Sequence, residues 1–236
     1  MKANRIREIF HNIDLDLSDR QVQQFIDYFH LLVEWNNKMN LTAITASDEV
    51  LIKHFADSVI SAKMVDYKAY NSLVDIGTGA GFPGIPLKIV YPHLEVTLVD
   101  ALNKRVQFLN VVIETLELDG IEALHGRAED LARTSMRDGY DLCVSRAVSQ
   151  LNVLCEYCMP FIRPGGLFIS YKGSKTLEEL EKSANAIKLL GGQLKEVTDQ
   201  VSLSDLIKRG FVIIDKISET DEKYPRRAGK PLKKPL

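Results

Sequence analysis

Two acids and a run of glycines stand at the spacing of a nucleotide-binding turn. The stretch Ser72–Pro86 begins as an apolar strand, reaches Asp75, and continues through Gly77 and Gly79 toward a new helix. Glycine adopts positive φ and lets a ligand approach where a Cβ would clash. The two prolines that follow suit the first turn of a helix. We therefore expect a ligand to lie on backbone amides at the start of that helix.

The same stretch is compatible with two ligand classes. Gly79–Gly84 fits the pattern G-x-G-x-x-G, and Asp100 follows at about the ~20-residue distance expected of a ribose-binding acid in a dinucleotide site. Against a dinucleotide, Phe82 is bulky, and Asp75 beside the loop would repel a pyrophosphate. A carboxylate there suits a cationic ligand with an ammonium and a sulfonium. The stretch resembles the first motif of the class I S-adenosylmethionine-dependent methyltransferases, and the pattern alone leaves both classes open.

Length and composition set broad limits on the fold. The chain has 236 residues, of which 45% are hydrophobic, so one large domain or one domain with an appendage can form a core. A net charge of -2 does not settle whether nucleic acid is a partner, because the distribution of charge matters more than its sum. The sequence contains no apolar run near ~18 residues, and its start lacks the apolar core of a signal peptide. We expect a cytoplasmic protein without a membrane span.

The three cysteines fit a reducing compartment. Cys155 and Cys158 form a CxxC pair, but neither a second pair nor a nearby pair of histidines accompanies it. Zinc needs four ligands. We therefore expect no metal and interpret the two cysteines as packing residues of a helix.

Helices are expected throughout the first 70 residues. Ser18–Gln21 resembles a capping box and is followed by apolar residues at helical spacing. A polar stretch then separates this helix from another that begins near Ser47. His54 and Asp57 lie three residues apart on the second helix and could share a face, which we interpret as a helix-surface pair.

Apolar strands alternate with helical segments from Asn71 onward, which predicts parallel βαβ units. The expected strands are Ser72–Asp75, Glu95–Asp100, Ile121–His125, Tyr140–Ser145, Gly165–Tyr171, about Gln193–Val201, and Phe211–Ile217. The two late strands fit an antiparallel pair. The predicted fold is α/β: a Rossmann-like, seven-stranded sheet with helices on both faces and an antiparallel last strand. We divide the chain into an N-terminal helical region, residues 1–70, and a domain of residues 71–236 with a basic tail.

The basic tail, Lys223–Leu236, carries six cations and no acid. Its prolines and glycine prevent a long helix. Such a segment is either a plain solvated tail or a means of neutralising nucleic-acid phosphates, and we favour contact with RNA. The candidate RNA-binding residues are Arg226, Arg227, Lys230 and Lys233.

Three motifs point to one family. They are Asn40–Thr45 followed by His54 and Asp57–Ser58, the turn Asp75–Pro86, and Tyr224–Pro231. With these motifs the chain resembles the bacterial small-subunit ribosomal RNA methyltransferase G family, also called glucose-inhibited division protein B. The resemblance implies transfer of a methyl group from S-adenosylmethionine to N7 of one guanine in 16S ribosomal RNA. The substrate would be that RNA or an assembling small ribosomal subunit, and the enzyme a monomer.

The resemblance also implies site residues, which lie at the carboxyl ends of the expected strands. Gly77 and Phe82 would contact the cofactor, Ala128 and Glu129 would flank its adenine, and Arg146 would complete the site and orient ligands. Together with those inferred from the turn and from strand position, the cofactor-binding residues expected are Asp75, Gly77, Gly79, Phe82, Asp100, Ala128, Glu129 and Arg146. We expect no general base. The alternatives are a methyltransferase for a small molecule or a protein, and a NAD-dependent oxidoreductase.

Overall fold

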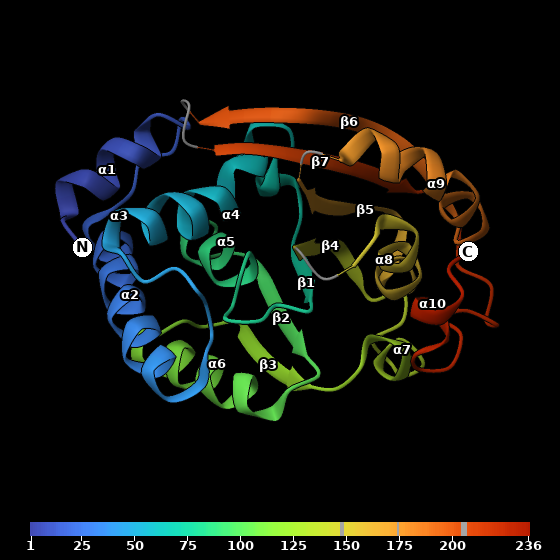
Figure 1. Cartoon of the computed structure of the whole chain (residues 1–236), viewed down its shortest axis with the longest axis horizontal. Helices are drawn as coiled ribbons and strands as arrows, with labels where there is room; N and C mark the ends of the chain where they lie inside the picture. Colours follow the sequence, from blue (N-terminus) through green and yellow to red (C-terminus); the bar gives the residue numbers. More distant parts are fainter. Residues whose placement is uncertain (147–148, 174, 204–206) are drawn as a thin grey trace.

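A single mixed β-sheet is the centre of the fold. The computed structural model describes residues 1–146, 149–173, 175–203 and 207–236. Its seven strands follow the order β3-β2-β1-β4-β5-β7-β6 (Figure 1). The strands are β1 (Ser72–Ile76), β2 (Glu95–Asp100), β3 (Ile121–His125), β4 (Tyr140–Arg146), β5 (Ile162–Lys172), β6 (Gly192–Leu203) and β7 (Ile207–Lys216). Strands β1 to β5 are parallel, whereas β7 runs antiparallel to both β5 and β6. The predicted fold class is confirmed.

Helices cover both faces of the sheet, because successive strand residues point to opposite sides. Leu73 and Val144 face an apolar cluster shared with the N-terminal helices, while Val74 and Cys143 face a second cluster. The first face carries α1 (Ala3–His11), α2 (Asp19–Met39), α3 (Ser47–Val50), η1 (Leu51–Ala56), α4 (Asp57–Val59), η2 (Ile60–Lys63), η3 (Tyr67–Ala69), α5 (Gly84–Val90) and α6 (Asn103–Thr115). The second carries α7 (Ala128–Leu131), α8 (Leu151–Cys158), η4 (Met159–Phe161), α9 (Thr176–Leu189) and α10 (Lys230–Lys233).

The N-terminal helices are packed onto the sheet. The capping box at the start of α2 is present: Gln21 N donates to Ser18 Oγ at 3.3 Å, and Ser18 N donates to Gln21 Oε1 at 2.9 Å. Phe25 of α2 and Phe55 of η1 are buried in the same cluster as Leu73 of β1. The division into residues 1–70 and residues 71–236 stays a prediction.

Three local features differ from the sequence prediction. The helix expected from Ser47 is divided into short turns, with a π-helical stretch over Leu51–Ala56. Strand β5 begins at Ile162, which pairs with Tyr140 before the register shifts, so the turn expected to precede the strand lies inside it. Strand β7 begins at Ile207, because its backbone ladder with β6 extends beyond the apolar residues that mark a strand in the sequence.

The two cysteines of the CxxC pair lie on α8, and both are fully buried in the second apolar cluster. This confirms their interpretation as packing residues. The described ranges contain no group of three or more His, Cys, Asp or Glu side chains placed to hold a metal ion. Within the same ranges, no helix is both long and apolar enough to cross a membrane.

Candidate active site

The glycine turn after β1 is shaped by backbone conformations that other residues adopt poorly. Gly77 has φ 73° and Gly79 has φ 63°, both in the left-handed region. Gly77 N donates to Val99 O at 2.9 Å, which fixes the turn beside the end of β2. A Cβ on Gly79 would meet no atom within 4 Å, so this glycine faces open space. The turn therefore presents bare backbone to a ligand.

Asp75 lies behind this turn. Its side chain is fully buried, and its Oδ2 accepts hydrogen bonds from Thr78 Oγ1 at 2.7 Å and from Gly84 N at 2.8 Å. Oδ1 is buried without a hydrogen-bond partner. Burial raises the pKa of Asp75 to about 7, against which the two hydrogen bonds act. Asp75 thus contacts the turn from inside, and its predicted contact with a ligand stays a prediction.

Asp100 joins the end of β2 to the glycine turn. Its Oδ2 accepts a hydrogen bond from Gly79 N at 3.0 Å, and its Oδ1 accepts one from Leu102 N at 2.9 Å. Arg105 Nη1 lies 3.3 Å from Oδ2. The side chain of Asp100 also lines a cavity, so this carboxylate can meet a ligand while holding the turn in place.

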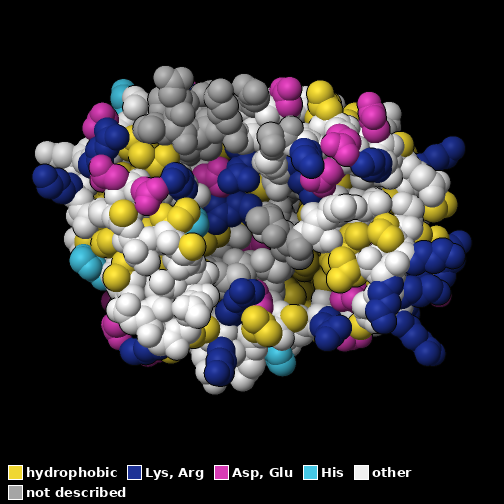
Figure 2. Space-filling view, in the orientation of Figure 1, with side chains coloured by type: hydrophobic (Ala, Val, Ile, Leu, Met, Phe, Trp, Pro, Cys, Tyr) yellow, Lys and Arg dark blue, Asp and Glu magenta, His cyan; other side chains and the backbone are white. Residues whose placement is uncertain are grey.

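Two cavities meet at this edge of the sheet. The large cavity, of about 460 Å³, is lined by Leu41, Thr42, His54, Gly77, Thr78, Gly79, Ala80, Phe82, Asp100, Ala101, Leu102, Arg105 and Arg146. The small cavity, of about 220 Å³, is lined by Ile76, Gly77, Val99, Ala101, Gly126, Arg127, Ala128, Glu129, Tyr157, Gly229 and Leu232. Both include Gly77 and Ala101, at the carboxyl ends of β1 and β2, which is the ligand edge of an α/β sheet. Figure 2 shows a hollow near the centre of one face, with Lys and Arg side chains inside it.

Arg146 at the end of β4 is held by a buried carboxylate. Asp57 is fully buried, and its Oδ2 accepts a hydrogen bond from Arg146 Nη1 at 2.7 Å. Arg209 of β7 donates from Nε to Oδ1 and from Nη2 to Oδ2 of the same carboxylate, each at 2.7 Å. The interpretation of Asp57 as part of a helix-surface pair is therefore wrong, because its charge is balanced inside the protein by two guanidinium groups.

The Phe82 ring contacts both a cation and an imidazole. The Arg146 guanidinium is 5.0 Å from the centre of the Phe82 ring, and the His54 ring stacks on Phe82 at 4.7 Å with an interplanar angle of 20°. His54 Nε2 lies 2.8 Å from Thr42 Oγ1, and its Nδ1 lies 3.2 Å from Lys53 O. Burial, helped by the charge of Arg146, lowers the pKa of His54 to about 4. The imidazole is therefore neutral near neutral pH.

The basic tail packs against the small cavity. Gly229 N donates to Glu129 Oε1 at 3.0 Å, and the Glu129 side chain is almost fully buried. Gly229 and Leu232 line the cavity together with Ala128 and Tyr157. The predicted adenine-flanking pair, Ala128 and Glu129, thus lines the same cavity as the tail.

Arg226 does not have the free guanidinium expected of an RNA ligand. Its Nε donates to Glu156 Oε1 at 2.8 Å, and its Nη2 donates to Oε2 at 2.5 Å. Glu156 is fully buried, and the Arg226 side chain is 15% exposed. This ion pair gives Arg226 the structural role of fixing the tail to α8. The other candidate RNA ligands, Arg227, Lys230 and Lys233, are exposed.

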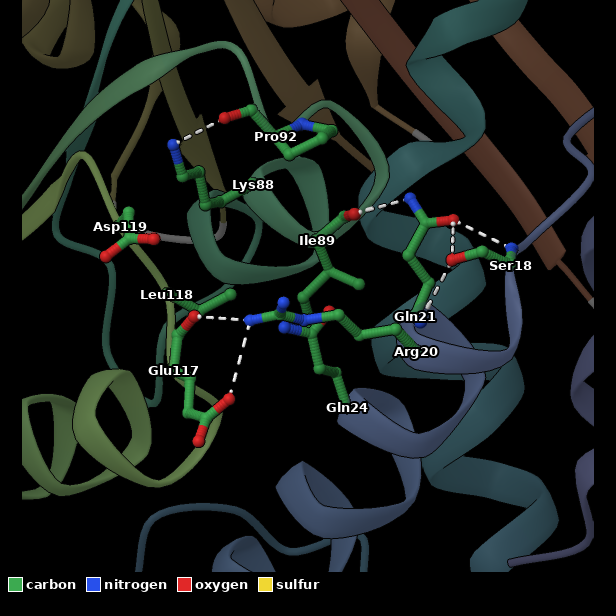
Figure 3. A pocket seen from close by; sticks show the side chains of 10 residues that line it. All are labelled: Ser18, Arg20, Gln21, Gln24, Lys88, Ile89, Pro92, Glu117, Leu118 and Asp119. Atoms are coloured by element: carbon green, nitrogen blue, oxygen red, sulfur yellow. Dashed lines mark hydrogen bonds and ion pairs between the residues drawn. The ribbon is translucent and has the colours of Figure 1, made fainter.

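A third cavity, of about 460 Å³, lies at the opposite edge of the sheet, near the amino ends of β2 and β3. Figure 3 shows Lys88, Gln21 and Arg20 bonding to backbone oxygens around this cavity. Gln21 Nε2 donates to Ile89 O at 2.7 Å, and Arg20 Nη2 donates to Glu117 O at 3.2 Å. These contacts join α2 to α5 and to the loop before β3. We therefore assign this cavity a structural role.

Sequence reasoning missed several residues that shape the site. Tyr28 of α2 donates a hydrogen bond to Ala80 O and so supports the glycine turn from the N-terminal region. Arg209 carries no local signal, because its partner Asp57 is 152 residues away in the chain. Thr42 belongs to the motif Asn40–Thr45, yet only the fold places it beside His54.

The site fits S-adenosylmethionine. The ligand has a flat purine, a ribose diol, and a methionine portion with an ammonium, a carboxylate and a sulfonium. The apolar walls of the small cavity suit the purine. Asp100 lines the large cavity beside Ala101, which both cavities share, and so can meet the ribose. The open space at Gly79, which a side chain would fill, and the cation of Arg146 suit the methionine portion.

The fold and the site define a class I S-adenosylmethionine-dependent methyltransferase. Two solved structures share the fold. An S-adenosylmethionine-dependent methyltransferase from Aquifex aeolicus aligns with a TM-score of 0.57 at 14% identity, over 75% of this chain and 97% of its own. The fibrillarin pre-rRNA processing protein of Methanococcus jannaschii aligns with a TM-score of 0.54 at 13% identity, over 70% of this chain and 74% of its own.

The chain belongs to the rRNA small subunit methyltransferase G family, whose family model matches residues 21–207. A relative from Lachnoclostridium phytofermentans named "Ribosomal RNA small subunit methyltransferase G" is 51% identical over 95% of this chain and 93% of its own. One of the same name from Brevibacillus brevis is 46% identical over 100% of both chains. The resemblance inferred from the three motifs is confirmed, and the oxidoreductase alternative is excluded.

Proposed function

We infer that this protein transfers a methyl group from S-adenosylmethionine to N7 of a guanine in 16S ribosomal RNA. The observation that carries the proposal is the meeting of two cavities at Gly77 and Ala101, which gives one extended ligand site along the carboxyl edge of the sheet. Membership of the family supplies the substrate class. The enzyme is thus a 16S ribosomal RNA guanine-N7 methyltransferase.

The residues around the two cavities have separate roles in binding the cofactor. The backbone of Gly77 and Gly79 lies against the ligand, and the Asp100 carboxylate accepts hydrogen bonds from the ribose hydroxyls. Ala128 and Glu129 flank the purine. Asp75 supports the cofactor site indirectly, because the hydrogen bonds that it accepts from Thr78 and Gly84 hold the turn in its conformation.

Arg146 and Phe82 orient the reacting partners. Arg146 is kept in place by Asp57 and directs its charge toward the large cavity, where it can hold a carboxylate. Phe82, which contacts both Arg146 and His54, offers an apolar wall. Leu102, 55% exposed at the same cavity, adds apolar surface against which a purine base can pack.

Methylation of guanine N7 needs no general base. N7 carries an in-plane lone pair and no proton, and the cofactor supplies an electrophilic methyl group on its sulfonium. The protein must therefore align the lone pair with the methyl and sulfur, and such alignment can supply about 7–11 kcal/mol of the barrier. His54 suits this chemistry, since its lowered pKa makes it a weak base and both of its ring nitrogens face protein oxygens.

RNA approaches over an exposed basic surface. Arg227, Lys230 and Lys233 are exposed on the tail, and Figure 2 shows Lys and Arg side chains gathered along the edge where Figure 1 places this segment. Cations on such a surface neutralise phosphates and release counterions, which makes affinity fall with salt. Free 16S ribosomal RNA and an assembling small subunit both present these phosphates. We further propose that the enzyme acts as a monomer in the cytoplasm.

Binding experiments test this assignment. Calorimetry is expected to show binding of S-adenosylhomocysteine and no binding of NADH. RNA binding measured between 50 and 200 mM salt, a range over which phosphate contacts weaken affinity strongly, should show a steep fall. An affinity for substrate that does not change with salt would instead favour a small neutral substrate or a protein.

A further inference from the structure

The cofactor cavity includes a wall from a part of the chain outside the methyltransferase sheet. Gly229 and Leu232 of the basic tail line the small cavity together with Ala128 and Tyr157. Gly229 N donates to Glu129 Oε1 at 3.0 Å, so the tail and the adenine-flanking residues are directly connected. The Leu232 side chain is 63% exposed although its neighbour Pro231 is buried. An apolar side chain in that position is ready to cover a flat apolar ligand.

The tail is firmly anchored before it reaches the cavity. Arg226 pairs with the buried carboxylate of Glu156 through both its side chain and its backbone N, the latter at 2.7 Å. Arg137 donates to Tyr224 O at 2.9 Å and to Thr220 O at 2.5 Å. These bonds fix where residue 229 begins the last short helix, so the wall has a defined place.

The outer side of the same segment is strongly positive. Arg227, Lys230, Lys233 and Lys234 are all exposed. Among the described residues, none of these four cations forms an ion pair with an acid. Apolar contact on the cavity side and free cations on the solvent side thus occur within eight consecutive residues, 227–234.

We propose that the segment Gly229–Lys233 is part of the cofactor site and links cofactor binding to RNA binding. Leu232 packs on the purine of the cofactor, and phosphates bound by Arg227, Lys230 and Lys233 hold the segment against the cavity. Because binding free energies are reciprocal, RNA then tightens the cofactor by the same factor as the cofactor tightens RNA. This inference rests on the proposed function and adds residues and a coupling to it.

The proposed contact between Leu232 and the purine is tested by calorimetry with S-adenosylhomocysteine in the absence of RNA. Leu232→Ala removes apolar contact with the purine and is expected to weaken affinity about three- to tenfold. Leu189→Ala is the matched control, because Leu189 is 42% exposed at the end of α9 and lines neither cavity. Equal affinities for the two variants and the unaltered protein would overturn the role of the wall.

The coupling is tested by repeating the titration with a saturating 16S ribosomal RNA transcript at low salt. The unaltered protein should bind S-adenosylhomocysteine about fivefold or more tightly with the transcript present, which lies within the usual range of coupling. For the variant R227Q/K230Q/K233Q, the ratio of its affinities with and without the transcript should fall to about one. A gain that persists in this variant would overturn the coupling.

The failure of this inference can be told apart from failure of the proposed function. Unaltered protein that binds no S-adenosylhomocysteine at all would overturn the proposed function and the inference with it. Unaltered protein that binds normally, with Leu232→Ala equal to Leu189→Ala, would overturn the inference alone.

Discussion

Replacing Asp57 by alanine should destabilise the protein and weaken its hold on the cofactor. The substitution removes the acceptor of both Arg146 and Arg209, whose side chains are only 9% and 23% exposed. Breaking a buried ion pair by removing one partner costs about 3–5 kcal/mol. Because water partly reaches Arg209, we expect the lower end, about 3 kcal/mol, which for a chain of this size lowers the melting temperature by about 6–12 °C.

The Asp57→Ala substitution should also leave the Arg146 guanidinium without a fixed position. Arg146 would keep its contact with the Phe82 ring but lose its 2.7 Å anchor, so its guanidinium would no longer be fixed in the large cavity. Misplacement by about 1 Å can cost about 100-fold in rate. We therefore expect weaker S-adenosylhomocysteine binding by calorimetry and a slower single-turnover methylation step at saturating ligands.

A matched control separates this effect from the loss of any surface charge. Glu49 pairs with Lys53 one turn away, and both side chains are 49% exposed. Such exposed pairs contribute about 1 kcal/mol or less, so Glu49→Ala should melt within a few degrees of the unaltered protein. Asp57→Asn, which keeps one acceptor oxygen, should fall between. If Asp57→Ala melts like Glu49→Ala and binds the cofactor product normally, the argument for a positioning carboxylate is refuted.

Three further predictions follow from the site and the core. Gly77→Val should remove cofactor affinity measured by calorimetry, because a branched Cβ resists φ 73°. The control Gly173→Ala should bind the cofactor normally, since a Cβ there meets no atom within 4 Å. Equal binding by both variants would contradict a role for the turn. Because burial lowers the pKa of His54 to about 4, this residue contributes stability above pH 6.5 that is lost as the pH falls toward 4. When the urea midpoint of unfolding is plotted against pH, His54→Gln should flatten the curve between these two pH values. An unchanged slope would argue against a buried neutral imidazole. The three buried cysteines should resist a thiol reagent at pH 8 in the folded protein and all react in denaturant, since burial raises the pKa of the Cys155 thiol; rapid labelling of folded protein would show that the helix opens.

The sequence predicted the sheet well because strands carry a local signal. Apolar runs that end in an acid, as at Asp75 and Asp100, mark both the strand and its ligand edge, and the glycines after β1 mark the turn. Strands β5 and β7 begin earlier than the sequence predicts, because backbone pairing continues where the side chains no longer alternate.

Residues whose roles depend on distant partners could not be predicted. Asp57 looked like a surface residue, since Arg209 approaches it only when β7 enters the sheet beside β5. Arg226 looked like an RNA ligand for the same reason, because Glu156 lies 70 residues away in the chain. Counting cations in the tail gives its charge but cannot show which of them the fold has already neutralised.

The atom that receives the methyl group is the most direct test of the account. The measurement uses S-adenosylmethionine labelled in its methyl group and 16S ribosomal RNA from a strain that lacks this enzyme. Reduction of the product followed by aniline cleaves RNA at N7-methylguanosine. We predict incorporation into 16S RNA with one new cleavage that depends on the enzyme, at a rate that shows no ionisation of an enzyme base near neutral pH. Labelled RNA that resists cleavage, or no incorporation at all, would contradict guanine-N7 methylation.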